Sequence, residues 1–484
     1  MNAHLGSTPA LIPGDAAPPN TARPEFLTGP IAPQLLRLAL PVLVVLTLQT
    51  LVGVAETYFV SRLGTAAVAG VALVFPVFML MNMMSNGGIG GGVSSAVARA
   101  LGAGRIQDAH ALVLHAVVIA VVFGAAFSLG IWTLGKAMFG FLGATDDTLA
   151  NALLYANVLF GAAIPGWIAN LLGGALRGGG NVRVPAIVTA AGAVTTLALS
   201  PLFIFGWGFV PGLGVAGAGV ALIIFNVGSM VALALYTRSR HSPVHLRLAR
   251  LEIRLFKDIL RVGLVSAVGT IVANLTVVAA SGFVGAFGRD AIAGYGLASR
   301  LDYILIPLLF AIGTASVTMV GTNIGAGQHA HARRVAWTAA LISIIATESI
   351  GLTAALLPEA WIHLFSREPE VVRVGTAYLV RVAPFYAFTG LGMAMYFASQ
   401  GAARMTWPFL AGVLRLAAVI GLGWYGVVAT HGSLTQLFWI VAGSQLIFGG
   451  ISAIGIATGW GKGAARHETS RLAGSPQPAR NVTS

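Results

Sequence analysis

The chain has 484 residues, of which 57% are hydrophobic and only 9% are charged; its net charge is +13 and it contains no cysteine. Soluble domains carry about 25% charged residues, so this composition excludes a soluble protein and predicts one that lies in a lipid bilayer, while the missing cysteines exclude disulfides and thiolate metal sites. The excess of basic residues does not indicate nucleic-acid binding, because these residues are spread over short connections between apolar runs.

Taken in chain order, residues 1–33 hold seven prolines and no apolar core, which predicts a disordered cytoplasmic tail. Apolar runs follow. Each is long enough to supply the ~20 residues of a transmembrane helix. Twelve candidate spans are centred near residues 48, 82, 122, 160, 194, 224, 272, 304, 344, 386, 418 and 446. The polar range 459–484 is expected to form a second disordered cytoplasmic tail.

Basic residues test this count and orient the chain. With the N-terminus in the cytoplasm, the inner segments and their flanks hold 20 of the 28 lysines and arginines, and the outer loops hold five. The other three, Arg300, Arg381 and Arg415, fall inside spans. Positive charge collects on the cytoplasmic side of multi-pass proteins. The sequence therefore predicts an inner-membrane protein with both termini in the cytoplasm.

Similar segments recur at a fixed separation. FVSRLGTAAVAGVALV resembles FVGAFGRDAIAGYGLA at an offset of 224, and Tyr155 corresponds to Tyr378 at an offset of 223. Two further matches at the offset of 223 pair LGAG at 101–104 with IGAG at 324–327, and RGGGNVRVP at 177–185 with QGAARMTWP at 400–408.

This repeat predicts the fold class. We expect an all-α polytopic membrane protein whose twelve transmembrane helices form two six-helix bundles, related by pseudo-twofold symmetry along the membrane normal. The bundles would comprise residues 34–237 and 258–458. Between them, residues 238–257 form a basic cytoplasmic linker, which we expect to lie on the inner face as an interfacial helix. Substrate is expected at the seam between the bundles.

Several short motifs in this order resemble the multidrug and toxic compound extrusion family over roughly residues 34–458. They are LALP with Pro41, AETYFVSRLG, LGAG and IGAG, LRGGGNVRVP, SPLFIFG followed by GLGVAGAG, and ASRLD. The resemblance implies a twelve-span secondary exporter that exchanges protons or sodium ions for drugs, often aromatic organic cations. The wider superfamily also includes flippases for lipid-linked sugars, which share the two-bundle fold.

Glu56 is a lone acid near the end of the first span. The family carries its cation-coupling aspartate at this position, so the resemblance implies that role for Glu56. Low-dielectric surroundings penalise a charged carboxylate; such a group can bind and release a proton and attract a cationic drug when empty. The plain alternative is that Glu56, six residues before Arg62, reaches the outer headgroups. In span 5 the family often has an asparagine and an aspartate where this chain has Thr196 and Ser200. One acid instead of two favours protons over sodium.

Asp302 and Glu348 are the other acids within spans. Asp302 is two residues from Arg300, so the two point in different directions on a helix, and Arg415 or Arg381 are its possible partners. Asp302, Arg300 and Arg415 therefore form either a second coupling site or a structural ion-pair site, and the sequence leaves both open. For Glu348, in span 9, we favour a structural role.

Neutral polar and aromatic side chains supply the candidates for the substrate cavity, although such polar groups are more often interhelical hydrogen bonds than ligand contacts. The candidates are Gln49, Tyr58, Phe75, Asn86, Asn170, Thr196, Ser200, Asn274, Tyr303 and Gln400.

The sequence features bear on three functional classes. An ion-coupled exporter comes first, with a drug or metabolite, a proton or sodium ion, and the lipid bilayer as its partners; we expect a monomer with no cofactor and no metal site. A flippase for a lipid-linked precursor is the alternative, and it would need Arg300, Arg381 and Arg415 to face the cavity unpaired. An enzyme is disfavoured, since the chain has no HExxH motif and no Gly-rich phosphate loop with lysine.

Overall fold

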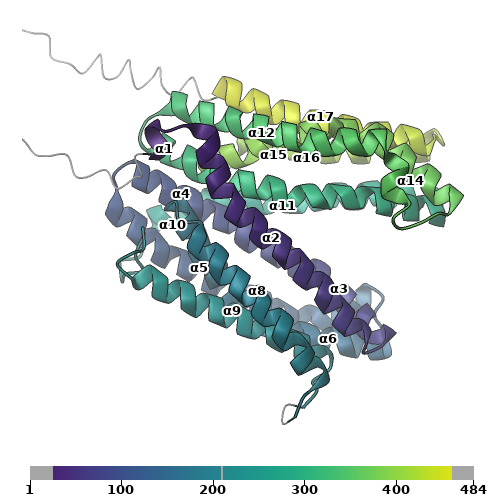
Figure 1. The fold of residues 1–484 in the computed structure, drawn as a ribbon, viewed down its shortest axis with the longest axis horizontal. Helices are drawn as coiled ribbons and strands as arrows, with labels where there is room; N and C mark the ends of the chain where they lie inside the picture. Colours follow the sequence, from purple (N-terminus) through teal and green to yellow (C-terminus); the bar gives the residue numbers. More distant parts are fainter. Residues whose placement is uncertain (1–24, 209–210, 460–484) are drawn as a thin grey trace, which may run out of the picture.

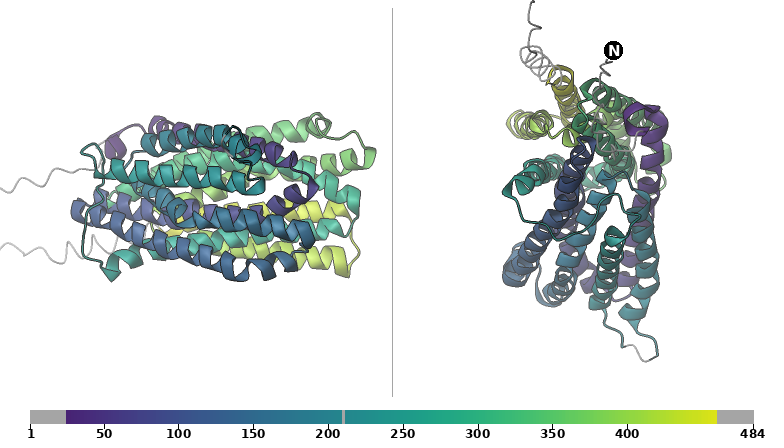
Figure 2. Two further views of the ribbon diagram at one scale, coloured as in Figure 1. Left: turned by 90° about the horizontal axis from the view of Figure 1, so that it is seen from below. Right: turned by 90° about the vertical axis from the view of Figure 1, so that its left-hand side faces the viewer.

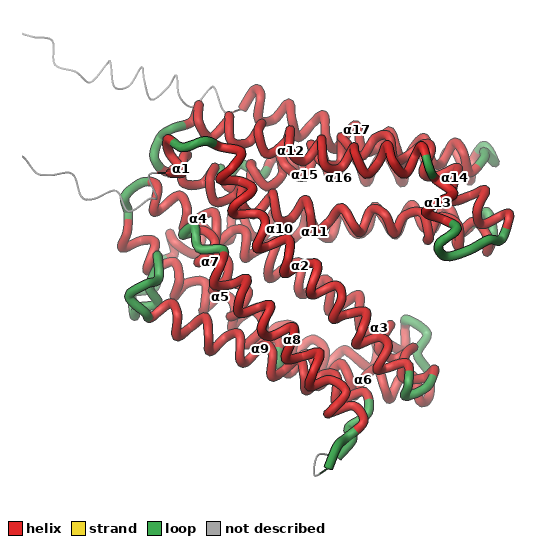
Figure 3. The backbone as a smooth tube through the Cα atoms, in the orientation of Figure 1, coloured by secondary structure: helices red, strands yellow, loops and turns green. Residues whose placement is uncertain are grey.

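The computed structural model describes residues 25–208 and 211–459. They fold almost entirely into helices that run side by side, with the connecting loops gathered at the two ends (Figures 2 and 3). A helix satisfies its own backbone hydrogen bonds, which a chain in lipid requires. The all-helical fold class predicted from composition is confirmed for these residues.

In the first half, the described residues 25–208 and 211–238 form nine α-helices and one π-helical turn. They are α1 (Glu25–Thr28), α2 (Ile31–Ser61), α3 (Thr65–Met83), η1 (Met84–Ile89), α4 (Gly90–Gly102), α5 (Ile106–Phe141), α6 (Asp146–Gly161), α7 (Ala163–Gly178), α8 (Arg183–Phe205) and α9 (Val215–Arg238).

In the second half, the residues that the structure describes, up to 459, form eight α-helices and two short turns of other helix types. They are α10 (Ile253–Gly285), α11 (Arg289–Gly325), α12 (His329–Leu356), α13 (Pro358–Ile362), α14 (Pro369–Val382), η2 (Ala383–Phe385), α15 (Tyr386–Gly401), α16 (Thr406–Gly423), η3 (Trp424–Ala429) and α17 (Leu434–Gly459).

Within the described residues, ten helices are long and apolar enough to cross a membrane, and the bent pair of α6 and α7, with an angle of 47° between them, would make an eleventh. Twelve were expected. The expected tenth span is interrupted at η2, where Pro384 lacks the N–H that a continuous helix needs.

The helices pack around three hydrophobic clusters. One joins α3 to α9 and reaches Leu255 and Ile259 at the start of α10. A second lies among α10, α11, α14 and α17, and a third joins the start of α2, through Leu35 and Leu38, to α11, α12 and α15. Thus α2 and α10 each begin against helices of the opposite half. The helices of the first half, α2 to α9, and those of the second half, α10 to α17, form two groups. The two groups meet at one end, here called the closed end, and diverge toward the other, the open end (Figure 1).

Backbone contacts dominate the closed end. A Cβ atom at Gly92 would lie 2.7 Å from the Ile259 carbonyl oxygen, and one at Gly102 would overlap the carbonyl of Thr322. The helices α4, α10 and α11 can approach this closely because small residues face one another. Beside these contacts, the Arg99 Nη2 atom lies 2.6 Å from the Asp258 Oδ1 atom.

The boundaries expected for the tails need correction. Residues 25–33 were assigned to a disordered tail, but they include α1 and the start of α2. Phe26 is buried, and its carbonyl oxygen accepts a 2.8 Å hydrogen bond from the Asn323 Nδ2 atom. Residues 1–24 and 460–484, the rest of the expected tails, lie outside the described residues.

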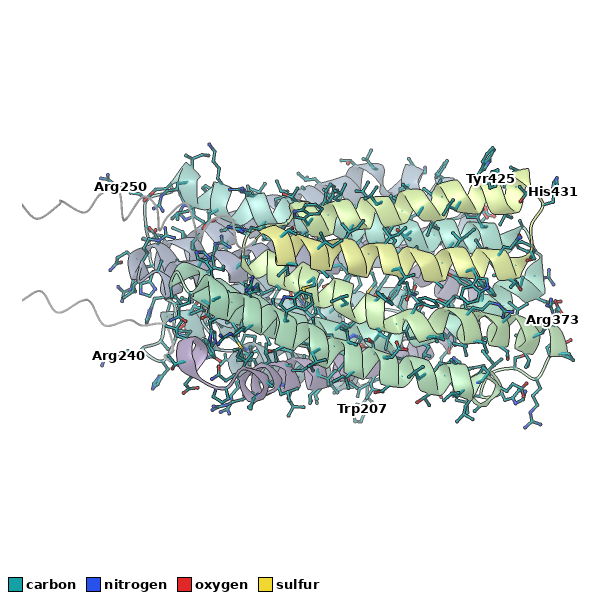
Figure 4. All side chains as sticks on the ribbon, turned by 90° about the horizontal axis from the view of Figure 1, so that it is seen from above. Trp207, Arg240, Arg250, Arg373, Tyr425 and His431 are labelled. Carbon is teal, nitrogen blue, oxygen red and sulfur yellow. The ribbon has the colours of Figure 1, made fainter. Side chains whose placement is uncertain are left out.

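The prediction of an interfacial helix in the linker is wrong. Residues 239–252, between α9 and α10, contain no helix. Their backbone bonds to α5 instead: the His245 N–H donates to the His110 Nδ1 atom at 3.0 Å, and the Glu252 N–H donates to the His115 Nε2 atom at 2.9 Å. Bonds to side chains of another helix replace the bonds that a linker helix would make. Arg240 and Arg250 of this linker lie at the closed end, opposite Arg373 and His431 (Figure 4).

Unusual backbone angles recur along the chain at the spacing of the sequence repeat. Gly64 and Gly288, 224 positions apart, have φ angles of 104° and 101°. Further pairs with positive φ stand 223 positions apart: Gly104 with Gly327, Gly180 with Ala403, and Gly208 with His431.

Candidate functional site

Glu56 is half-buried near the open end of α2 and turns toward α8. The hydroxyl of Ser200, which is fully buried, donates a 3.1 Å hydrogen bond to the Glu56 Oε1 atom. Tyr155 of α6, also buried, interacts electrostatically with the same carboxyl. Arg62 does not pair with Glu56; its Nη2 atom donates to the Tyr58 hydroxyl at 2.6 Å. The carboxyl therefore lies against neighbouring helices, not beside the arginine that follows its span.

The Glu56 site offers one carboxyl and one hydroxyl, from Ser200. Sodium prefers several oxygen ligands, with carboxylates among them, and here Ser200 stands where the resemblance implies an aspartate. Thr196, one turn earlier on α8, is buried and donates to the Gly192 carbonyl at 3.0 Å. Among the described residues, no group of three or more histidine, cysteine or acidic side chains could hold a metal ion.

Asp302 of α11 is held by two buried tyrosines. The Tyr378 hydroxyl donates to its Oδ2 atom at 2.7 Å, and the Tyr386 hydroxyl donates to its Oδ1 atom. Arg415 of α16 interacts with Asp302 electrostatically, but no ion pair within 4 Å joins Asp302 to a basic residue in the part of the chain described.

The three arginines expected within spans do not converge. The Arg300 guanidinium lies 5.6 Å from the ring centroid of Phe365, toward the open end. The Arg381 Nη1 atom donates to the Ala377 carbonyl of its own helix at 3.0 Å. Only Arg415 lines a cavity with Asp302 and Tyr303, and this cavity has a volume of about 100 Å³.

Polar residues also gather where the two groups of helices meet. The Arg177 Nη2 atom donates to the Asn86 Oδ1 atom at 2.7 Å. The Gln400 Nε2 atom donates to the Gly87 carbonyl at 2.9 Å. Asn86, Arg177 and Gln400 line a pocket of about 10 Å³, the size of one water molecule. Asn170 donates to the Ser85 hydroxyl at 2.8 Å. These candidates form the interhelical bonds that the plain alternative expected.

Four of the expected cavity residues do not join these clusters: Gln49, Tyr58, Phe75 and Asn274 are exposed on helix surfaces. The Asn274 amide donates to the Thr270 carbonyl one turn earlier, at 2.9 Å. The direction in which such a side chain points depends on how its helix packs against its neighbours. In an apolar span, the polarity of a residue does not indicate that direction.

Glu348 of α12 lies beside the break between α14 and α15. Its Oε2 atom accepts a 2.7 Å hydrogen bond from the Ala387 N–H, in the first turn of α15. The first N–H groups of a helix lack partners within that helix, and a carboxylate is favourable there. This contact can anchor the start of α15, and the structural role favoured for Glu348 stays a prediction.

Sequence reasoning missed the residues around the two acids and at the closed end. Tyr155 and Tyr378, noted only as a matched pair of the repeat, lie near Glu56 and Asp302 respectively. The repeat could have indicated them, since equivalent tyrosines stand near an acid in each half. Arg99 and Arg177 belong to the 20 basic residues counted in the inner segments and their flanks, and nothing in the local sequence distinguishes them, or Asp258, from charges that lie in water.

Comparisons with known proteins identify a family and several relatives. The MatE family model matches residues 41–202 and 266–425. A protein of Shewanella oneidensis named "FAD transporter" is 25% identical over 385 residues, covering 78% of this chain and 83% of that protein. A "Probable multidrug resistance protein NorM" of Thermotoga maritima is 25% identical over 382 residues, covering 78% and 82%.

Solved structures share the fold. A structure described as the outward-facing conformation of a multidrug resistance MATE family transporter superposes with a TM-score of 0.80 at 23% identity, covering 93% of this chain and 98% of that one. A MOP superfamily transporter from Pyrococcus furiosus, reported with reversed polarity of its binding pocket, gives a TM-score of 0.81 at 23% identity, covering 95% and 100%.

Proposed function

Because the chain belongs to the MatE family of multidrug and toxic compound extrusion proteins, which are membrane transporters and not enzymes, we propose that it is a secondary active exporter. It exchanges protons, in preference to sodium ions, for drugs or toxic organic compounds that are mainly cationic, by alternating access. The observation that carries this proposal is the contact between Glu56 and Ser200. A lone carboxyl among packed helices, bonded to a hydroxyl, can take up and release a proton where a sodium ion would lack ligands.

We further propose the complete architecture: twelve spans in two six-helix bundles, residues 34–237 and 258–458, with pseudo-twofold symmetry. The twelfth span would be the interrupted segment from α14 to α15. Three features support the repeat. The family model matches each half once; the break at Ala162 stands 223 positions before Phe385 in the second break; and the positive φ angles recur at the same offset.

We propose that the protein lies in the inner membrane with both termini in the cytoplasm. We also propose that it acts as a monomer. The support is that the described chain begins and ends at the closed end, where the basic linker also lies (Figures 1 and 4). Positive charge favours the cytoplasmic side. On this orientation the open end faces outward.

The flippase alternative loses support from the arginines. An anionic head group would need several basic side chains on one cavity, but Arg300 and Arg381 are engaged elsewhere and Arg415 has Asp302 nearby. The exporter is therefore the better interpretation of the charges within the spans.

Efflux of ethidium from vesicles that contain the purified protein tests the proposal, with a proton gradient and a sodium gradient imposed separately. We expect efflux with the proton gradient and none with sodium alone. Glu56→Gln keeps the size of the side chain and removes its proton site, so it should abolish proton-driven efflux, while Glu359→Gln, at an exposed acid of α13, should leave it unchanged. Efflux driven only by sodium would overturn the ion assignment, and full transport by Glu56→Gln with unchanged pH dependence would remove that residue from the mechanism.

A further inference from the structure

The cavity of about 100 Å³ in the second half holds two opposite charges that are not in contact. It lies among α10, α11, α14, α16 and α17 and is lined by Asp302 and Arg415. These two groups interact electrostatically, yet no ion pair within 4 Å joins them in the described chain. A pair that served only to neutralise itself would close to direct contact, because the attraction rises as the charges approach.

Arg415 has hydrogen-bonding capacity that the described residues do not use. Its guanidinium lies 5.6 Å from the centroid of the Phe448 ring, and its Nε atom is buried without a hydrogen-bond partner. A guanidinium carries five N–H donors in a planar fork, and leaving buried donors unpaired is costly. The group that matches this fork best is an oxyanion, with which arginine forms two parallel hydrogen bonds.

The rest of the lining presents acceptors and aromatic surface. Both oxygens of the Asp302 carboxyl accept hydrogen bonds, from the hydroxyls of Tyr378 and Tyr386, which fix its position in the lining. The Gln445 Oε1 atom is buried without a partner, so it can accept a hydrogen bond. Tyr303 lines the cavity and is 61% exposed, so the cavity communicates with the surface of the protein.

This arrangement discriminates among classes of ligand by charge. A simple cation would be attracted to Asp302 but repelled by Arg415, and a doubly charged phosphate would be attracted to Arg415 but repelled by Asp302. A molecule with one carboxylate and one cationic nitrogen meets an opposite charge at each end. The volume accommodates such a group and not a whole drug-sized molecule, so the remainder of the ligand would extend past Tyr303.

We propose that this cavity is a recognition site for zwitterionic substrates, in which Arg415 binds the carboxylate while Asp302 and the Gln445 carbonyl oxygen face the cationic nitrogen. The site rests on the proposed export function, which it deepens by naming a substrate class. Its place is in the second half of the chain, apart from Glu56 in the first.

A matched pair of dyes tests the proposal: rhodamine 110, which has a free carboxyl group, and rhodamine 123, its methyl ester. Binding to the purified full-length protein is measured by fluorescence polarisation, and efflux from vesicles is measured separately. In Arg415→Gln the Kd of rhodamine 110 should rise about tenfold or more, as expected for the loss of a charge-assisted pair, while the Kd of rhodamine 123, a cation that Arg415 repels, should stay unchanged or fall. The surface variant Arg373→Gln should change neither.

A second, isosteric variant keeps the test informative if Arg415→Gln fails to fold. Gln445→Glu places a carboxylate in the cavity that Arg415 lines, where it competes with the carboxylate of the substrate for Arg415. Both dyes gain an attraction for their cation, but only rhodamine 110 loses a partner for its carboxylate, so its binding should weaken relative to that of rhodamine 123. Equal effects on both dyes, or no effect in either variant, would overturn the zwitterion site. If the wild-type protein binds the dyes with this discrimination but exports neither, the proposed transport function fails and the site stands.

Discussion

Replacing Asp258 with asparagine removes the carboxylate that Arg99 holds across the closed end. The Arg99 Nη2 atom lies 2.6 Å from the Asp258 Oδ1 atom, and the same guanidinium also donates to the Ser95 hydroxyl and, at 3.4 Å, to the Gly401 carbonyl. Asp258 is on α10, Arg99 on α4 and Gly401 on α15, so one side chain bridges the two groups of helices. We expect Asp258→Asn to destabilise the closed end and favour a form in which the open end closes.

The two partners differ in burial, which sets the size of the effect. The Arg99 side chain is 11% exposed and the Asp258 side chain is 36% exposed. Removing one partner of a buried ion pair costs about 3–5 kcal/mol, and the exposure of Asp258 places Asp258→Asn near ~3 kcal/mol. At about 1.4 kcal/mol per tenfold change, the conformational equilibrium should shift roughly 100-fold. Arg99→Gln leaves an acid that water can reach, so its effect should be nearer ~1 kcal/mol.

The absence of native cysteine makes the measurement direct. Thr145→Cys and Ser433→Cys introduce labelling sites at two exposed positions at the open end, one on each group of helices. Pulsed electron paramagnetic resonance then measures the distance between the two spin labels. Asp258→Asn should create a large population at shorter distance, Arg99→Gln a smaller one, and the double variant should fall between them. An unchanged distance distribution in folded Asp258→Asn, or a larger effect of Arg99→Gln, would refute the reasoning from burial.

Two further predictions concern the closed end. Gly102→Ala should lower the free energy of unfolding by about 1–3 kcal/mol, because the added Cβ would overlap the Thr322 carbonyl. Gly228→Ala is the control, since nothing lies within 4 Å of its Cβ position, and it should have little effect. Equal shifts of the melting temperature in the two variants would contradict the packing. His115→Phe removes the acceptor for the backbone of the linker, so trypsin should cleave after Arg250 faster than in the wild type at equal global stability; an unchanged cleavage rate would show that the histidine does not hold the linker.

Composition and motif order predicted the membrane class and the family, and both are confirmed. They succeed because charge depletion over the entire chain and motifs repeated at a fixed offset leave few alternatives. The helix that carries Glu56 was also placed correctly, although the role of Glu56 in coupling stays a prediction.

Side-chain direction could not be predicted to the same degree. Tyr58, two residues after Glu56, points to another side of the helix than Glu56 does. Its hydroxyl accepts a hydrogen bond from Arg62. The linker was expected to be helical because it is basic, but its backbone is bonded by His110 and His115 of a distant segment. The tyrosines around Asp302 come from α14 and α15, and their convergence follows from the break between those helices, which the apolar pattern does not reveal.

The glycine contacts at the closed end bear on the speed of the cycle. Where α4 meets α11, Gly102 lies against the backbone of Thr322 and Gly325 lies against the backbone of Arg99. Contacts of this kind can separate without a change of side-chain rotamer, and they can re-form in the same way. In the proposed alternating-access cycle, such backbone contacts can separate and re-form on each turnover, while the ion pair of Arg99 with Asp258 stabilises the form in which this end is closed.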